Sequence, residues 1–267
     1  MSSPHISVAA ETISTLSIPM FGNIEITNAM LSAFVVCVFM CVGGTIAGQI
    51  ITSGRKISKF QHFLEGFLLY IRNLTGSNLG SNDQAKKYLG LSITLFLFIV
   101  FGSWFGLIPG VLDLKYGSVH LFRAPTTDLN ACIALAIVAF MTVQIAGFKA
   151  LGWGYLGKFF TIQGGGMGSV VGILEFVLEW SRLLSYSFRL FGNIFAGEVL
   201  IIILAYLSDQ FLGNFKFLVP LPTLIILMET AVALIQGYVL ISLMTVFIKM
   251  AQTSHHHDEK HDDKAHA

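Results

Sequence analysis

The sequence predicts an all-α integral membrane protein with about five transmembrane helices and one interfacial amphipathic helix. Hydrophobic residues make up 54% of the 267 residues and charged residues only 12%, about half the charged fraction of an ordinary soluble domain. The charges are also unevenly distributed, since no Asp, Glu, Lys or Arg occurs in residues 26–54, 88–112 or 129–148. Each of these gaps can hold a helix of about 20 residues, which is the length that crosses a bilayer.

The first predicted span is residues 28–51, which follow an N-terminal segment (1–27) without lysine or arginine. The basic cluster Arg55, Lys56 and Lys59 comes directly after the span. By the positive-inside rule this cluster places the next loop on the inner side of the membrane and residues 1–27 outside. Residues 57–72 repeat apolar side chains at i, i+3 and i+4 with polar residues on the other faces, a pattern that predicts an amphipathic helix lying in the interface.

The second and third predicted spans are residues 88–112 and 129–148. The last two apolar segments, about 169–208 and 214–250, are longer. A helix of 40 residues would reach roughly 60 Å, about twice the hydrocarbon thickness of a bilayer. We therefore expect the last two helices to be strongly tilted, bent or partly outside the bilayer. Residues 28–250 form the predicted membrane domain, and residues 251–267 form a polar, His-rich tail on the inner side.

Several other functions are disfavoured by the sequence. The net charge is +1 and the basic residues lie between apolar segments, so no basic face for nucleic acid is expected. The three cysteines lie in apolar runs without neighbouring ligands, so we expect no metal site, and we expect no cofactor. Residues 152–158 match GxxxxGK, but Phe159 follows where a phosphate-binding loop needs Ser or Thr, and no strand is predicted before it. We expect no nucleotide site in this chain.

Ionisable residues inside the last two apolar segments are the main functional signal, since a charged side chain in a bilayer costs at least about 2.5–3.5 kcal/mol on insertion scales. Spacings of seven place Glu175, Arg182 and Arg189 on about one helical face, and Asn193 joins that face one turn later. Glu198 is nine residues past Arg189 and points roughly the opposite way. It therefore cannot simply be the partner of that arginine on the same helix.

The last segment carries Glu229 and Gln236, which are seven residues apart and share a face. Antiparallel packing of the last two segments would bring Glu229 close to Glu198 as a coupled protonatable pair. Because burial favours a neutral carboxyl whereas arginine stays charged, these residues indicate a proton path beside a permanent charge. The alternative is structural ion pairing between helices, for which Glu179 and Arg182 at i, i+3 are the candidate pair.

The segment SRLLSYSFRLFGNIFAGE at 181–198 closely resembles the motif SRPxSLxxRLFGNxxAGE/H of the a subunits of F-type ATP synthases. The stretch METAVALIQGYVLISLMTVFI at 228–248 resembles the final helix of that family, and PTTDLN at 125–130 resembles its PTxDxN. The resemblance extends over nearly all of residues 28–250. It departs at Leu183, Tyr186 and Gly237, where the family usually has Pro, Leu and Ala.

The resemblance implies a stator subunit that forms two ion half-channels against a rotating ring of c subunits and couples proton translocation to ATP synthesis. Arg189 matches the essential arginine of the family. The resemblance also implies outer-side pathway residues, which are Asp128, Asn193, Glu198, Glu229 and Gln236, and Glu175 is the candidate for the inner side. It further implies a stator b subunit and the rest of the F-type complex as partners.

Two questions stay open in the sequence. The coupling ion can be H⁺ or Na⁺, since the ring carboxylate's surroundings would largely choose between them. The membrane can be a bacterial plasma membrane, which Glu198 and the charged tail favour, or the mitochondrial inner membrane. Two rival functions are a secondary proton-coupled transporter, which should show internal repeats and helices broken at the midplane, and a membrane scaffold held by structural ion pairs.

Overall fold

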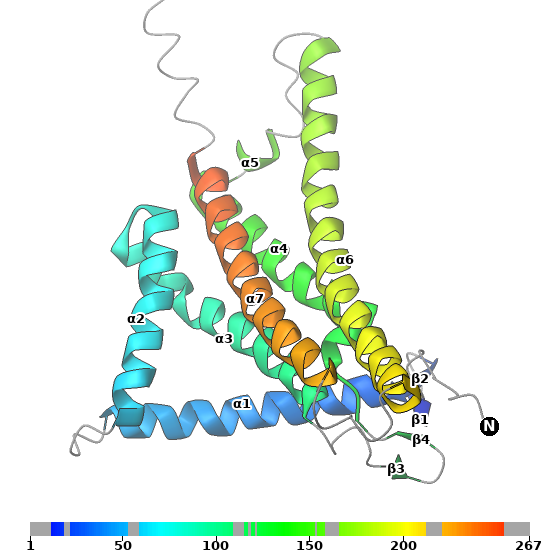
Figure 1. Cartoon of the computed structure of the whole chain (residues 1–267). Helices are drawn as coiled ribbons and strands as arrows, with labels where there is room; N and C mark the ends of the chain where they lie inside the picture. The colour runs from blue at the N-terminus through cyan, green and yellow to red at the C-terminus, as the bar shows by residue number, and fades with distance from the viewer. Residues whose placement is uncertain are drawn as a thin grey trace, which may run out of the picture. The chain divides into compact units, whose positions relative to one another are not determined.

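The computed structural model describes residues 12–18, 22–52, 59–108, 115–116, 119–120, 122–152, 154–157, 166–211 and 221–253 (Figure 1). The helices are α1 (Asn28–Thr52), α2 (Lys59–Leu79), α3 (Asn82–Leu107), the short 3-10 helix η1 (Pro125–Thr127), α4 (Leu129–Leu151), α5 (Gly154–Gly157), α6 (Gly166–Phe211) and α7 (Leu221–Thr253). The His-rich part of the predicted tail lies outside the described residues, as do residues 1–11.

Five helices of the described chain are long and apolar enough to cross a membrane, at 28–51, 83–107, 129–151, 172–204 and 223–252. The predicted multi-pass helical architecture is therefore confirmed. The predicted amphipathic helix is α2, whose buried side chains Ile71, Thr75 and Leu79 recur every four residues on one face. The side of the membrane on which each loop lies stays a prediction.

The last two membrane helices are unusually long, as the sequence predicts. Helix α6 has 46 residues and α7 has 33 residues, so they reach roughly 70 and 50 Å at about 1.5 Å per residue. Both exceed the roughly 30 Å of a bilayer's hydrocarbon core. Each helix therefore has to tilt or to extend beyond the bilayer, and neither is interrupted within its apolar stretch.

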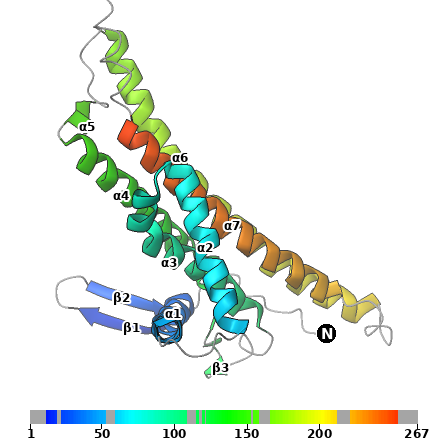
Figure 2. The ribbon, with the colours of Figure 1, turned by 90° about the vertical axis from the view of Figure 1, so that its left-hand side faces the viewer.

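Two small antiparallel hairpins add to the helices, and neither was predicted. Strand β1 (Thr12–Ile18) pairs with β2 (Gly22–Thr27), and β3 (Lys115–Tyr116) pairs with β4 (Val119–His120). Figure 2 shows β1 and β2 beside the start of α1. The signal for the first hairpin lies in its Thr- and Ile-rich runs, TISTLSI and GNIEIT, because such residues favour strands.

The residues of the chain divide into two compact units. Unit 1 comprises residues 1–64, 94–132 and 188–238, and unit 2 comprises residues 65–93, 133–187 and 239–267. In unit 1, Gly106 lies against Ala124 and Gly237 lies against the ring of Phe96. In unit 2, the side-chain amide of Asn78 donates to the hydroxyl of Thr245 (2.9 Å), which joins the end of α2 to α7. Each unit thus has its own set of close interhelical contacts.

Candidate functional site

The second half of α6 and the first half of α7 lie side by side and antiparallel in unit 1 (Figures 1 and 2). The two helices come close at Gly197 and Glu229, since a side-chain carbon at position 197 would collide with the Glu229 carboxyl group. Glu229 is only 3% exposed, and the charge of its neighbour Glu198 acts on it. The predicted proximity of Glu198 and Glu229 is therefore confirmed, whereas their role stays a prediction.

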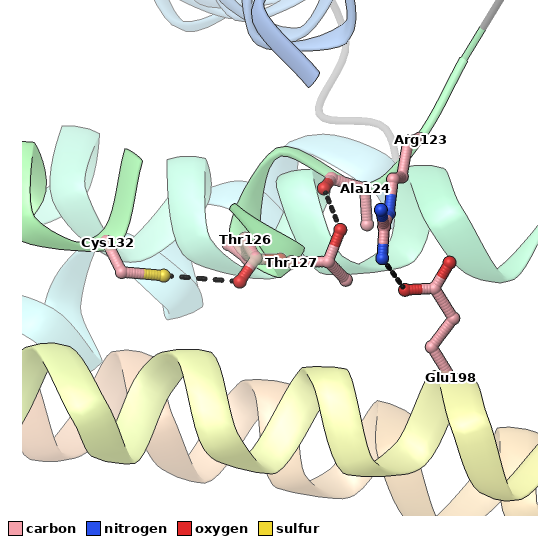
Figure 3. Close-up of polar contacts among 6 residues, drawn as sticks. All are labelled: Arg123, Ala124, Thr126, Thr127, Cys132 and Glu198. Atoms are coloured by element: carbon pink, nitrogen blue, oxygen red, sulfur yellow. Dashed lines mark hydrogen bonds and ion pairs between the residues drawn. The ribbon is translucent and has the colours of Figure 1, made fainter. Parts of the chain in front are cut away.

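Glu198 forms an ion pair with Arg123, which lies in the segment before η1 (Figure 3). The guanidinium Nη2 donates to the carboxylate Oε2 over 3.1 Å, and the two side chains are 8% and 26% exposed. Glu198 thus finds its cation in another segment, as its position opposite Arg189 requires. Arg123 is not among the site residues that the sequence predicts.

The position of Arg123 is set by hydrogen bonds on both sides of it. Its backbone N–H donates to the hydroxyl of Ser32 in α1 (3.1 Å), and that hydroxyl donates to the carbonyl of Asn28 (3.0 Å). On the other side, the Thr127 hydroxyl donates to the Ala124 carbonyl (2.7 Å), which stabilises the turn at η1 (Figure 3). The arginine is therefore held between α1 and η1 rather than on a free loop.

Asp128 lies at the start of α4, where it acts as a helix cap. One carboxylate oxygen accepts the N–H of Asn130 (2.9 Å), and its carbonyl accepts the N–H of Cys132 (3.1 Å). Such capping satisfies backbone groups that the first turn of a helix leaves without partners. The structure thus shows a structural role for Asp128, and its predicted role in the outer pathway stays a prediction.

Arg189 and Asn193 lie on an exposed stripe of α6 that continues through Ala196 and Leu200. Within the part of the chain that the structure describes, Arg189 forms no ion pair. Gln236 is not part of this exposed stripe. It lies in α7 and its side chain is only 3% exposed. The side-chain nitrogen of Gln236 has no hydrogen-bond partner among the described residues, and neither does Oε2 of Glu229.

Such orphaned buried polar atoms are costly, at about 1–3 kcal/mol each. Gln236 and Glu229 therefore mark a face of α7 where water or another polar group would be stabilised. Their predicted placement on one face of the helix is met, since both are buried on it.

Unit 2 holds Glu175, Glu179 and Arg182 of α6, and the candidate structural pair of Glu179 and Arg182 is not formed. The Arg182 guanidinium lies over the ring of Phe247, 4.4 Å from its centroid, in a cation–π contact. The Glu179 carboxylate instead accepts a hydrogen bond from the side-chain amide of Gln144 (2.7 Å). Glu175 is half-buried in the same unit, where its charge acts on Tyr155.

The GxxxxGK segment begins with the end of a helix and not with a phosphate-binding loop. Gly152 has a φ of +58°, a left-handed conformation that favours glycine after a helix. Its N–H donates to the carbonyl of Phe148 (2.8 Å), which closes the last turn of α4. No strand precedes it, and Lys158 lies outside the described residues.

The contact between Gly197 and Glu229 predicts a position-specific cost for a methyl group on α6. Gly197→Ala is expected to lower the free energy of unfolding by about 1–3 kcal/mol, as overpacking does. Gly192→Ala is the matched control, since nothing lies within 4 Å of a side chain there, and alanine favours the helix by about 1 kcal/mol. Unfolding in detergent followed by circular dichroism measures both, and equal stability of the two variants would contradict the contact.

Comparisons with known proteins agree with these observations. A family model described as the ATP synthase A chain matches residues 8–249. The chain is 30% identical over 237 residues, which is 88% of this chain and 86% of the relative, to a protein of Gloeobacter violaceus named ATP synthase subunit a. It is 31% identical over 197 residues, 74% of this chain and 84% of the relative, to an ATP synthase subunit a of Sulfurihydrogenibium sp..

Proposed function

Because the chain belongs to the ATP synthase A chain family, we propose that it is the stationary subunit of the membrane sector of an F-type ATP synthase. In this role it forms two proton half-channels against a rotating ring of c subunits and couples proton translocation to ATP synthesis in the soluble subunits. One observation carries the proposal. Helix α6 presents a permanent cation, Arg189, on an open face, while another side of it, at Gly197 beside Glu198, lies against the carboxyl of Glu229 in α7.

The outer half-channel is assigned to the acidic pair Glu198 and Glu229. Glu198 is ion-paired with Arg123, whereas Glu229 has no cation partner among the described residues. Two carboxyls that lie close together on neighbouring helices can pass a proton from one to the other. The buried Gln236 amide extends this polar face of α7, and Asn193 and Asp128 are the other residues assigned to the outer side.

The surface that contacts the ring is assigned to the exposed stripe of α6 that carries Arg189. Ala196 in this stripe is small, so a partner helix can approach closely at that position. A ring carboxylic acid arriving beside Arg189 would be forced to ionise, because a nearby cation favours the charged form. The proton then leaves on the inner side, where Glu175 is the assigned residue. A b subunit would hold this chain in place.

The rival function of a secondary transporter has less support. Transporters bind their substrates where transmembrane helices are discontinuous near the midplane, whereas α6 and α7 run unbroken through their apolar stretches. The relatives named above come from bacteria, which supports a bacterial plasma membrane as the location.

Purification in a mild detergent tests the proposal directly. A tagged copy of this chain is expected to carry with it a ring of small membrane subunits and a soluble head with ATPase activity, with one copy of this chain in each complex. Mass spectrometry of the intact complex gives the stoichiometry. Purification of the chain alone, or as an oligomer of itself without ATPase activity, would contradict the proposal and favour a transporter.

A further inference from the structure

A second buried carboxyl lies in unit 2, apart from the residues assigned to the outer half-channel. Glu179 of α6 is 8% exposed and accepts a hydrogen bond from the Gln144 side-chain nitrogen of α4 (2.7 Å). The Gln144 side-chain oxygen accepts a hydrogen bond from the hydroxyl of Tyr155 in α5 (2.7 Å). Tyr155 is 2% exposed. Three elements thus build a hydrogen-bonded chain that ends at an acidic side chain.

Packing around Tyr155 holds this hydrogen-bonded chain in place. The Tyr155 ring lies against Gly147, where a side-chain carbon would come within 2.5 Å of the ring. Its N–H donates to the carbonyl of Gly152 at the end of α4 (3.3 Å), and its ring also contacts Phe148. These contacts place α5 against the end of α4 so that the phenol hydroxyl meets Gln144. Glycine at 147 is required for this approach.

The hydrogen-bonded chain can serve both protonation states of Glu179. With Glu179 ionised, the Gln144 N–H donates to the carboxylate and the Tyr155 O–H donates to the amide oxygen. With Glu179 protonated, a half-turn of the Gln144 amide lets the carboxylic O–H donate to the amide oxygen and the amide N–H donate to the phenol oxygen. Both states keep their hydrogen bonds, so burial does not trap the carboxyl in one of them. That property is required of a group that takes up and releases a proton.

The charged groups around Glu179 agree with such exchange. Burial and the negative charges of Glu179 and Glu175 raise the pKa of Tyr155 to about 12, so the phenol keeps its proton at neutral pH. The cation nearest in sequence, Arg182, lies over the ring of Phe247 and does not lock the carboxylate in an ion pair. A neutral amide, that of Gln144, donates a hydrogen bond to Glu179.

The positions of Glu179 and Gln144 along their helices indicate on which side of the membrane the hydrogen-bonded chain lies. Glu179 precedes Arg189 by ten residues in α6, whereas Glu198 follows it by nine. Gln144 lies five residues before Lys149, the basic residue of the last turn of α4, which the positive-inside rule places on the inner side. On the premise of the proposed function, we propose that Glu179 is a proton-exchanging carboxyl of the inner half-channel, with Gln144 and Tyr155 as its positioning residues.

Inverted membrane vesicles test this assignment, because ATP-driven pumping then draws protons from the medium through the inner half-channel. Glu179→Gln is expected to reduce pumping per assembled complex at least about tenfold, in line with the loss of a proton-transfer group. Glu179→Asp, which keeps a titratable carboxyl, should retain clearly more activity and restore the dependence of pumping on medium pH. Asp83→Asn is the matched control, since it removes an exposed carboxylate of α3 and should leave the pumping rate unchanged.

Variants of the positioning residues separate proton exchange from a structural role. Gln144→Met removes both hydrogen bonds at similar volume and should reduce pumping severalfold, with a shifted pH profile, at equal complex content. Tyr155→Phe should have a smaller effect of the same kind. Wild-type pumping per complex in Glu179→Gln, or equal loss in Glu179→Gln and Glu179→Asp, would overturn the assignment. A different variant tests the proposed function itself: near-normal coupling of proton flow to ATP synthesis in Arg189→Ala would contradict it, whatever the result for Glu179.

Discussion

Arg189→Ala is expected to abolish proton-driven ATP synthesis while leaving the complex assembled. The side chain is exposed on α6 and forms no ion pair among the described residues, so its loss breaks no ion pair within the described chain. A cation beside each arriving ring carboxyl favours ionisation, whereas desolvation alone would keep that carboxyl neutral. Without Arg189, a protonated ring site can pass directly between the half-channels, and we expect the complex to leak protons.

The measurement compares ATP synthesis with passive proton flux in vesicles that contain equal amounts of assembled complex. Arg189→Lys should rescue poorly, because an ammonium that loses its water against the ring can lose its proton and lacks the fixed fork of a guanidinium. Arg182→Ala is the control, since Arg182 lies seven residues before Arg189 on the same helix and contacts the Phe247 ring. This variant should lower ATP synthesis less than Arg189→Ala. Near-normal synthesis in Arg189→Ala would show that the stator mechanism assigned to this residue is wrong.

Replacing Glu198 and Glu229 together by glutamine is the second large expected effect. Glutamine keeps the volume and the polarity of each side chain but cannot carry a proton. Removal of positioned proton-transfer groups typically costs about 10²–10⁴-fold in rate, so synthesis per complex should fall by at least about a hundredfold. Unchanged ATP-driven pumping in the double variant would remove both residues from the proton path.

The ion pair of Glu198 with Arg123 requires a further control. Glu198→Gln alone removes the carboxylate that pairs with the buried Arg123, and breaking a fully buried pair in this way costs about 3–5 kcal/mol of stability. The combination Arg123→Met with Glu198→Gln removes both charges and relieves that cost. If the combined variant regains stability but not proton flux, the carboxyl itself carries the proton. Recovery of flux would assign the loss to the stranded cation and contradict a role for Glu198 in transfer.

The membrane helices could be predicted because local properties of the chain decide them. Gaps without charged residues at 26–54, 88–112 and 129–148 are as long as a bilayer requires, and the structure has a helix over each. The seven-residue spacing of Glu229 and Gln236 likewise predicts their shared face, since the period of an α-helix does not depend on what surrounds it. The length of α6 also follows from the long, mainly apolar segment at about 169–208.

The partners of the charged residues could not be predicted in the same way. Glu198 bonds Arg123, 75 residues away, and Glu179 bonds Gln144, 35 residues away, whereas Arg182, three residues from Glu179, turns to Phe247. Sequence spacing limits which residues can share a helical face, but it contains no information on which distant segment lies opposite that face. The sequence therefore specifies the spans and the faces that carry charge. The packing of separate helices selects the cation, amide or ring that each charged group meets, because these contacts depend on distances between segments that are remote along the chain.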